Sequence, residues 1–432
     1  MRVVIVGGGV VGLCCAYELM RAGAEVTVVE RDRCGGATSL GNAGWVVPSL
    51  SAPMPAPGIT MQTLKMLFKS DGPLRLRPRL DADFLRWCWR FWRNSTQERH
   101  EAGLKALMKL NQQTIQLYKD LRASGVEFEM HESGLLIVTL SEETLEEYAE
   151  LLEAAKAAGY AGEVQLLRKE ALLRLEPALS DAVVGAMYAK DDLHVRPDTL
   201  SSGLVSYLAA RDVRILEDTE VYGLEPAGKG GWLVSTSREK LAADRVVVAA
   251  GMWSSELLAK LGVHIPLEAG KGYSVTASGR GTKPRHALKL AEPNVACSPF
   301  EEAVRISGIF ELGGRDLFVN RRLLEGVLRS ASVFLRDWVM EEPRFEWAGL
   351  RPTTPDDLPL IGAVPGFEQL YVATGHGMLG VTLGPATAAA MVPLVLENRM
   401  LGVLQPFRVD RFAAYRGKAH KQPLRQISEI TD

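Results

Sequence analysis

The chain of 432 residues lacks the features typical of disulfide-rich, zinc-dependent or nucleic-acid-binding proteins. It has five cysteines and no CxxC pair, and such an odd, scattered set favours a reducing compartment over a disulfide framework. The seven histidines stand apart from one another and from the cysteines, so the sequence predicts no metal site. Its 50 basic and 52 acidic residues give a formal charge of −2, which provides no electrostatic basis for binding nucleic acid.

Residues 3–20 are apolar enough to be mistaken for a signal peptide or a membrane span. They contain three consecutive glycines, and the charge before them is the single Arg2, which argues against both interpretations. We therefore expect the chain to start at Met1 and to be cytoplasmic. The length and the apolar fraction of 47% predict two domains that share an interface.

The amino-terminal segment has the pattern of a nucleotide-binding βαβ unit. A strand over residues 3–6 runs into Gly7-Gly8-Gly9-Val10-Val11-Gly12, a helix follows to about Ala22, and a second strand over residues 26–29 ends at Glu30. Gly7 permits a tight turn, Gly9 lets backbone N–H groups approach a pyrophosphate, and Gly12 permits close packing of helix and strand. Glu30 can accept hydrogen bonds from a ribose. By itself this unit predicts a dinucleotide site for either NAD or FAD.

The rest of the chain has several further predicted elements. Residues 31–60 have no periodicity and form a long loop, which is usually functional in a compact enzyme. Residues 104–118 have helical spacing, residues 134–140 read as a buried strand, and Ser141 is a plausible cap for a helix through about Ala158. Short strands between residues 214 and 250 suggest a meander that ends in another strand of the nucleotide domain. More strands and a helix around residues 322–338 follow.

Motifs near the carboxy terminus carry a resemblance to a known family. They are Gly349-Leu350-Arg351-Pro352 leading to residues 358–362, and residues 370–382 with the turn Gly375-His376-Gly377. Together with the amino-terminal unit, Gly41-Asn42-Ala43-Gly44 and residues 246–254, they resemble the glycine and D-amino-acid oxidase family of flavoenzymes. Within that family the chain looks most like the bacterial D-amino-acid dehydrogenases, which share the Asn-Ala-Gly turn and a proline-rich loop after it, here residues 48–57.

This resemblance implies an α/β fold with two domains. The first is a Rossmann-like FAD-binding domain of the glutathione-reductase type, with a βαβ unit and an antiparallel meander, expected over residues 1–60, 196–261 and 341–432. The second is an inserted α+β substrate-binding domain with a mixed or antiparallel sheet, expected over residues 61–195 and 262–340. The implied activity is oxidation of the Cα–N bond of an amino acid, with the D configuration favoured, by hydride transfer from Cα to flavin N5. The imino acid formed would hydrolyse to an oxo acid and ammonia.

Three residues are expected to act on the substrate. Arg351 is the candidate carboxylate anchor, because a guanidinium can hold a carboxylate through two parallel hydrogen bonds; the alternative is a structural ion pair with Asp356 or Asp357. His376 could donate to flavin or substrate, or be only a turn residue. Tyr273 is a candidate for side-chain recognition, and core packing is its alternative. Further candidates for recognition are Trp45, His194 and Arg196.

The resemblance implies FAD, and the lack of a histidine in residues 31–50 favours noncovalent attachment. Where some glycine-oxidase relatives carry an arginine for substrate binding, this chain has Met378, which weakens an assignment to glycine oxidase. The residues expected to bind the cofactor are Gly7, Gly9, Val10, Val11, Gly12, Glu30, Arg31, Thr38, Ser39, Asn42, Ala43, Gly44, Val221, Ala250, Gly251, Trp253, Gly349, Arg351, Gly375, Gly377, Met378, Leu379, Gly380, Val381 and Thr382.

Residues 84–93 alternate aromatic residues with arginines in a helical pattern. Such a helix can lie at a membrane surface, which would suit a dehydrogenase that passes electrons to a quinone on the inner face of the membrane; the alternative is a substrate-domain helix with its arginines in solvent. The sequence leaves open whether oxygen or a quinone accepts the electrons, and which oligomer forms. It also leaves open three rival functions: a secondary-amine, glycine or proline-type oxidase, a nicotinamide-dependent dehydrogenase, and a flavin-binding protein without turnover.

Overall fold

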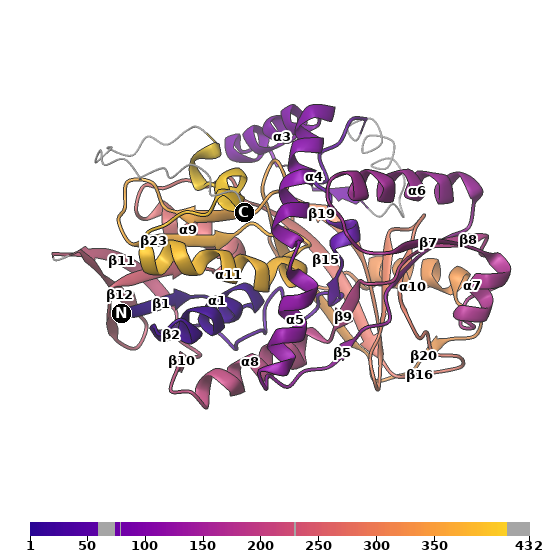
Figure 1. Ribbon diagram of the computed structural model, residues 1–432, viewed down its shortest axis with the longest axis horizontal. Helices are drawn as coiled ribbons and strands as arrows, with labels where there is room; N and C mark the ends of the chain where they lie inside the picture. The colour runs from indigo at the N-terminus through magenta and orange to yellow at the C-terminus, as the bar shows by residue number, and fades with distance from the viewer. Residues whose placement is uncertain (59–73, 78, 229, 413–432) are drawn as a thin grey trace.

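Two sheets lie side by side in the computed structural model, which describes residues 1–58, 74–77, 79–228 and 230–412 (Figure 1). The first sheet has six strands, and all neighbours are parallel except the last, which is antiparallel. Its order is β10 (Arg214–Leu216), β2 (Glu25–Val29), β1 (Arg2–Val6), β14 (Arg245–Val248), β23 (Leu370–Thr374) and β22 (Leu360–Ala363). The amino-terminal, middle and carboxy-terminal parts of the chain therefore meet in one sheet.

Both faces of this sheet are covered, and the valine-rich strands explain why. In β1, Val3 and Ile5 pack against the helices on one face, whereas Val4 and Val6 pack on the other face with the three-stranded meander. The run from Val3 to Val6 is apolar at each position, as is typical of parallel sheets with both faces covered. The helices are α1 (Val10–Arg21), α8 (Pro197–Ala209) and α11 (Gly380–Glu397), and the meander is β11 (Val221–Ala227), β12 (Gly231–Thr236) and β13 (Lys240–Ala243). The α/β fold expected from the sequence is confirmed.

Helix α11 is the most apolar long helix of the described chain, and by length and composition it could cross a membrane. Two-thirds of it is buried, however, and it packs along α1, so it is a core helix of this domain. It begins at Gly380. Its first turn therefore lies directly after the turn that contains His376.

The second sheet has nine strands and mixed direction, as expected for the inserted domain. Along its length most neighbours are antiparallel, and β17 and β6 form a parallel pair. Its order is β21 (Phe345–Thr353), β15 (Glu268–Ala277), β19 (Val304–Leu312), β18 (Val295–Pro299), β17 (Ala287–Leu290), β6 (Leu135–Thr139), β8 (Gly185–Ala189) and β7 (Val164–Arg168), with β4 (Leu74–Leu76) parallel to β19.

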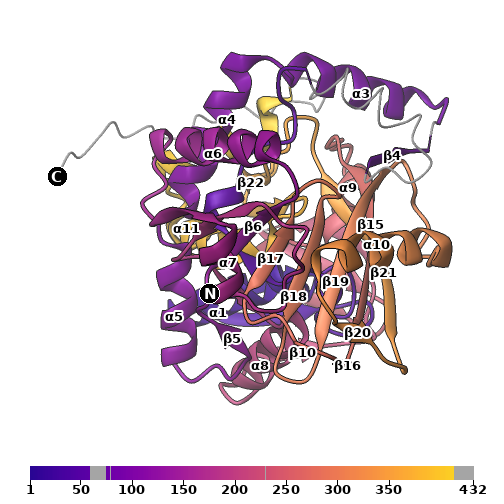
Figure 2. The same ribbon diagram turned by 90° about the vertical axis from the view of Figure 1, so that its right-hand side faces the viewer.

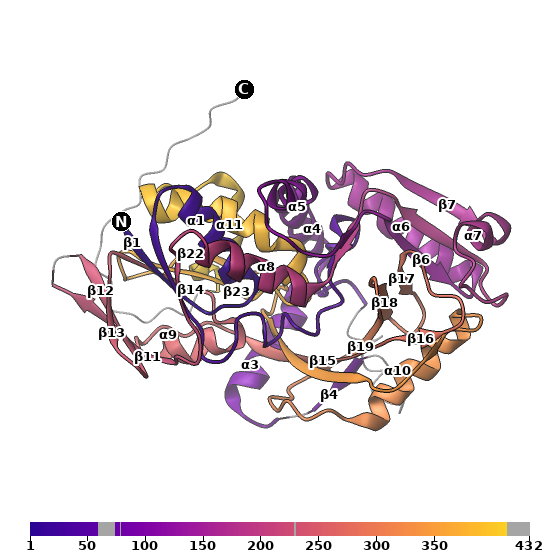
Figure 3. The same ribbon diagram turned by 90° about the horizontal axis from the view of Figure 1, so that it is seen from below.

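Two helices cover opposite faces of this nine-stranded sheet (Figures 2 and 3). Helix α6 (Glu142–Ala157) packs on β6 and β8, and the Ser141 side chain caps it by accepting a hydrogen bond from the Thr144 N–H, as its sequence predicts. Helix α10 (Arg321–Phe334) packs on β15, β18 and β19 through Leu324, Val327 and Phe334. A residue's parity along a strand therefore decides whether it faces α10 or the opposite side of the sheet.

The remaining elements of the described chain are further helices, 3-10 turns and two small sheets. The helices are α3 (Ala82–Asn94), α4 (Gln97–Asn111), α5 (Thr114–Ala123), α7 (Lys169–Leu175) and α9 (Ser254–Ala259), with 3-10 turns η1 (Pro48–Leu50), η2 (Gly251–Trp253), η3 (Gly402–Phe407) and η4 (Val409–Arg411). One small sheet joins β3 (Trp45–Val46), β9 (Leu193–Val195) and β5 (Met130–His131), and another joins β16 (Gly279–Arg280) and β20 (Val339–Met340).

Two segments pack across the domain boundaries expected from the sequence. Helices α4 and α5 fall within the expected substrate-binding domain, yet they contact α11, and the Tyr118 hydroxyl donates to the Val381 carbonyl over 2.6 Å. Strand β21 falls within the expected FAD-binding domain, yet it pairs along β15 from Glu268 to Thr276. These segments differ from the domain assignment expected from the sequence for two reasons. Helices α4 and α5 bury apolar side chains against α11, and β21 is held to β15 by strand pairing.

Candidate functional site

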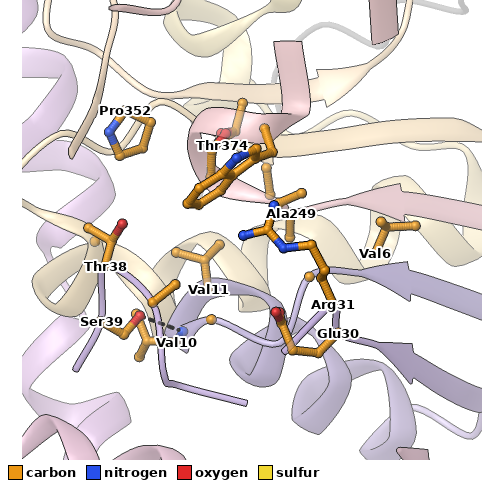
Figure 4. A pocket seen from close by; sticks show the side chains of 18 of the residues that line it. Val6, Val10, Val11, Glu30, Arg31, Thr38, Ser39, Ala249, Pro352 and Thr374 are labelled. Atoms are coloured by element: carbon orange, nitrogen blue, oxygen red, sulfur yellow. Dashed lines mark hydrogen bonds between the residues drawn. The ribbon is translucent and has the colours of Figure 1, made fainter. Parts of the chain in front are cut away.

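A cavity of about 280 Å³ lies at the carboxyl ends of β1, β2, β14 and β23. This edge of a parallel sheet is where ligands bind in open α/β folds. Figure 4 shows Glu30 and Arg31 on one side of the cavity and Thr38 and Pro352 on another. The cavity is therefore lined by segments that lie more than 300 residues apart in the sequence.

The glycine loop after β1 is shaped by contacts that a side chain would break. Gly7 has φ +111°, and a Cβ there would lie 2.5 Å from the Ala249 carbonyl oxygen. A Cβ at Gly12 would lie 2.0 Å from the Gly7 carbonyl oxygen. At Gly9 the nearest atom is the Ser39 Oγ at 3.5 Å, an ordinary contact, so the protein leaves room above this residue. Gly7 and Gly12 are needed for the fold itself, whereas the space at Gly9 is available to a ligand.

Polar groups around the loop hold it in place. The Glu30 carboxylate accepts hydrogen bonds from the Gly8 N–H at 2.7 Å and the Asp32 N–H at 3.1 Å. Ser39 Oγ accepts from the Val10 N–H at the start of α1 at 3.1 Å (Figure 4). Each Glu30 oxygen keeps free lone pairs, and the remaining N–H groups of the α1 first turn stay free to bind an anion.

The opposite side of the cavity is built from loop 38–44, β21 and the start of α11. The Thr38 hydroxyl donates to the Leu350 carbonyl over 2.8 Å, and the Asn42 side chain accepts from the Gly44 N–H over 2.8 Å. Thr382 at the first turn of α11 donates to the Trp45 carbonyl over 2.9 Å. The N-terminus of α11 is thus held against loop 38–44, where its positive end can stabilise negative charge.

Most residues expected to bind the cofactor line this cavity, and the others lie outside its lining. The lining residues among them are Gly7, Gly9, Val10, Val11, Glu30, Arg31, Thr38, Ser39, Asn42, Val221, Ala250, Gly251, Trp253, Gly377, Gly380 and Val381, together with His376. Those outside the lining are Gly12, Ala43, Gly44, Gly349, Arg351, Gly375, Met378, Leu379 and Thr382.

Several lining residues have no signal in the sequence motifs. Glu256, Leu257 and Lys260 come from α9 and its end, and Thr219 and Glu220 come from the loop before β11. Pro352 and Thr374 lie inside the motifs named above and could have been predicted as lining residues. Helix α9 has no comparable motif, so only the fold brings its residues to the cavity. Among the described residues no cluster of acidic, histidine and cysteine side chains could hold a metal ion.

The shape and chemistry of the cavity fit FAD. Its lining reaches from Glu30 to the start of α11, the protein leaves room at Gly9 for a pyrophosphate, and residues of the first turns of α1 and α11 line it. Glu30 would hold the ribose, the first turn of α1 the pyrophosphate, and loop 38–44 with the start of α11 the flavin ring. FAD supplies a hydride acceptor when it is bound.

Arg351 lies beside this cavity without an acidic partner in the described chain. Its guanidinium rests on the backbone of Gly272, donates one hydrogen bond to the Ile309 carbonyl over 3.0 Å, and lies 5.8 Å from the centre of the Phe310 ring. Loss of hydration lowers the pKa of Arg351 to about 10. The two aspartates considered as partners are used elsewhere. Asp356 pairs with Arg411 at 2.7 Å, and Asp357 accepts from the Met54 N–H.

Tyr273 lies on the opposite face of the nine-stranded sheet from Arg351. Adjacent residues of a strand point to opposite faces, and the Arg351 guanidinium covers Gly272. Tyr273 is buried in the core with α10, and its hydroxyl has no hydrogen-bond partner in the part of the chain that the structure describes. Burial raises its pKa to about 12. This position supports core packing and not the catalytic role expected for Tyr273.

The further candidates for side-chain recognition gather in the small sheet of β3, β9 and β5. His194 stacks on His131 with ring centres 4.7 Å apart, and its Nε2 contacts the Pro299 carbonyl at 2.7 Å. Arg196 pairs with Asp198 at 3.0 Å. The Trp45 backbone pairs with His194. None of the three lines the cavity.

His376 lines the cavity but is a buried, neutral group. Its Nε2 lies 3.0 Å from the Thr387 hydroxyl of α11, and burial lowers its pKa to about 3. A neutral imidazole hydrogen-bonded to Thr387 fixes the turn before α11. It cannot supply a proton from an imidazolium near neutral pH.

The depressed pKa of His376 gives a prediction about stability. Between pH 6.5 and about 3 the unfolded chain binds a proton at this residue and the folded chain does not, so this residue destabilises the fold as the pH falls. His376→Gln should therefore lose less stability than the wild type between pH 7 and pH 5, by about 2 kcal/mol. Urea unfolding of both proteins at the two pH values measures this difference. An equal loss in both would show that His376 titrates normally.

Comparisons with known proteins agree with this geometry. The chain matches the family model described as "FAD dependent oxidoreductase" over residues 2–394. It is 33% identical over 405 residues to a D-amino acid dehydrogenase of Rhizobium johnstonii, which covers 91% of this chain and 96% of that protein. It is 28% identical over 386 residues to a D-amino acid dehydrogenase of Helicobacter pylori, covering 89% and 92%. The crystal structure of glycine oxidase from Bacillus cereus superimposes with a TM-score of 0.73 at 21% identity, covering 96% and 99% of the two chains. The chain belongs to the family of FAD-dependent oxidoreductases.

Proposed function

We propose that the protein oxidises the Cα–N bond of a D-amino acid, giving an imino acid that hydrolyses to a 2-oxo acid and ammonia. The observation that carries this proposal is Arg351, a partly buried guanidinium beside the cofactor cavity that has no carboxylate partner in the described residues. Such a group is suited to a carboxylate supplied from outside. The names of the curated relatives support the D configuration. FAD is proposed to bind noncovalently.

The residues of the chain would divide the work as follows. Arg351 binds the substrate carboxylate and thereby fixes the direction of the Cα–H bond. The amine enters neutral, so the site needs no side-chain base, in agreement with the low pKa of His376. The N-terminus of α11 stabilises negative charge that develops beside it, and loop 38–44 excludes water from the reacting atoms.

Anaerobic bleaching of the visible flavin absorbance tests the proposal. The purified protein is mixed with D- and L-amino acids, glycine, sarcosine and proline, one at a time. We expect rapid bleaching by D-amino acids and none by their L enantiomers. Bleaching by sarcosine or proline alone would establish the secondary-amine alternative, and a flavin that resists the whole panel would refute amino-acid oxidation. Colour that stays with the precipitated protein in acid would refute noncovalent attachment.

We also propose that α3 rests on a membrane surface, in a protein that is otherwise cytoplasmic. Helix α3 lies at the edge of the molecule (Figure 1). Leu85, Trp89 and Trp92 share one face of α3 and are 53%, 52% and 58% exposed, while Phe84 and Trp87 on the other face are buried. Arg93 lies over the Trp89 ring at 4.9 Å. An apolar stripe edged by arginines suits the headgroup region of an anionic bilayer, where a quinone would be within reach. The cytoplasmic location is supported by five free cysteines.

Vesicle sedimentation tests the membrane contact of α3. We expect the wild-type holoenzyme to sediment with anionic phospholipid vesicles, and Leu85→Glu and Trp89→Glu to lower the bound fraction at least fivefold, because each removes apolar area from the exposed stripe. Leu166→Glu is the matched control, since Leu166 is 45% exposed and lies on β7 of the nine-stranded sheet, away from α3. Equal binding by all variants, or no binding by the wild type, would end the membrane proposal.

A further inference from the structure

Two buried hydroxyl groups face each other on the sheet surface that carries Arg351. Ser274 of β15 and Ser307 of β19 are direct cross-strand partners, and their side chains are 0% and 6% exposed. Neither Oγ has a hydrogen-bond partner among the described residues. Directly opposed residues of an antiparallel pair have Cβ atoms about 5 Å apart and point to the same side. Leaving even one buried hydroxyl unpaired costs free energy, so two neighbours without partners call for an explanation.

The strand register places this pair on the same face as Arg351. Gly272 and Ser274 have the same parity along β15, and the Arg351 guanidinium covers Gly272. On the neighbouring strand β21, Trp347 is the direct partner of Ser274. The Trp347 ring lies so close to Gly41 and Gly349 that a Cβ at either position would be about 2.0 Å from it. The serine pair thus lies between the carboxylate anchor and the loop that lines the cofactor cavity.

Arg305 lies on the other side of the pair and binds both the sheet and loop 38–44. This buried guanidinium donates to the Thr276 hydroxyl at 2.8 Å, to the Leu40 carbonyl at 2.9 Å and to the Asn42 carbonyl at 2.6 Å. Arg305 has the parity of Ser307, and Thr276 that of Ser274, so both lie on the face of the serine pair. Arg305 ties loop 38–44 to the sheet through Nε and Nη1, and its Nη2 lies 4.0 Å from the Asp198 carboxylate.

We propose that Ser274 and Ser307 determine substrate specificity by hydrogen-bonding the side chain of the bound amino acid. This inference rests on the proposed function and names its substrate class, which is a short D-amino acid with a neutral hydroxyl or carboxamide group. Each serine hydroxyl can donate and accept, so the pair matches groups that do both. A site with buried polar groups rejects analogues that lack the matching group, because its own groups are then left unpaired. D-Serine and D-asparagine are the probes that fit this chemistry.

Reductive half-reaction kinetics of the holoenzyme test the assignment with matched substrates. D-Serine is compared with D-alanine, which lacks its hydroxyl, and D-asparagine with D-leucine, which keeps its shape and lacks its polar group. We expect wild-type bleaching, as the rate divided by the substrate dissociation constant, to favour the polar member of each pair at least tenfold. Ser274→Ala and Ser307→Ala should each lower this preference about tenfold, and the double variant should abolish it. D-Alanine bleaching should stay within twofold throughout.

Folding and site effects are separated by two controls. Neither serine hydroxyl has a partner, so both alanine variants should keep the wild-type melting temperature or exceed it. Ser201→Ala removes a buried, unpartnered hydroxyl from α8 and should leave every preference unchanged. A wild type without preference, or equal losses for D-serine and D-alanine, would overturn the specificity role while D-amino-acid oxidation stands. A protein bleached by no D-amino acid would overturn both.

Discussion

Replacing Arg351 with methionine should lower kcat/KM for the amino-acid substrate by about a thousandfold, or about 4 kcal/mol of transition-state binding. Methionine fills similar space but cannot hold a carboxylate. The same change should leave the melting temperature equal or higher, because the wild-type guanidinium is partly desolvated and has no acidic partner in the described chain. Steady-state kinetics and thermal unfolding of the holoenzyme measure the two effects. Loss of activity with unchanged or improved stability is the signature of a ligand anchor.

Two further variants define the role of Arg351. Arg351→Lys keeps the charge and loses the two-pronged geometry, so it should recover part of the activity and remain at least tenfold below the wild type. Tyr273→Phe changes the residue beside Gly272 on the other face of the same strand and should leave kcat/KM unchanged. If Arg351→Met lowers stability by several kcal/mol and activity in proportion, then Arg351 is a structural residue.

Alanine substitutions at Gly9 and Gly12 should have opposite consequences, although both residues belong to one loop. Gly12→Ala places a Cβ 2.0 Å from the Gly7 carbonyl oxygen, so we expect a loss of several kcal/mol of stability even without cofactor. Gly9→Ala has space within the protein, with its nearest contact at 3.5 Å, so the apoprotein should keep its stability. Its methyl group would occupy the position of the pyrophosphate, so FAD affinity should fall at least a hundredfold.

Urea unfolding of the two apoproteins and FAD titration by fluorescence quenching separate these effects. Gly384→Ala is a suitable control, because a Cβ at this position of α11 would make an ordinary 3.5 Å contact with Cys14 Sγ. It should change neither stability nor FAD affinity beyond small amounts. Normal FAD binding by a folded Gly9→Ala protein would refute the placement of the pyrophosphate in this loop.

The sequence predicts those parts of the site that depend on local geometry. The glycine loop and Glu30 belong to one βαβ unit, in which the spacing of strand, turn and helix is diagnostic. The resemblance adds loop 38–44 and the start of α11, whose motifs contain unusual runs of small residues. Glu256 and Lys260 could not be found in this way, since they reach the cavity only because α9 follows β14 on the meander side of the sheet.

Two other features depend on partners that sequence order hides. The choice between an ion pair and a free guanidinium at Arg351 is decided by Arg411, which takes Asp356 from 55 residues away. Tyr273 and Ser274 are adjacent, and only the pairing of β15 with β19 and β21 shows which of them shares a face with Arg351. A shift of one residue in that register would exchange their roles. Which residues of β15 face Arg351 could therefore not be predicted from the sequence.

Strand β21 contributes to both the proposed substrate site and the cofactor cavity. It is paired along its length with β15, its Arg351 is the proposed substrate anchor, and the next residue, Pro352, lines the cofactor cavity. Successive residues of a strand are about 3.3 Å apart, so the backbone fixes the distance between the two binding sites. No hinge motion can change that spacing without breaking the sheet. Substitutions in neighbouring strands can therefore change the substrate preference, while the distance between the substrate Cα and the flavin stays constant.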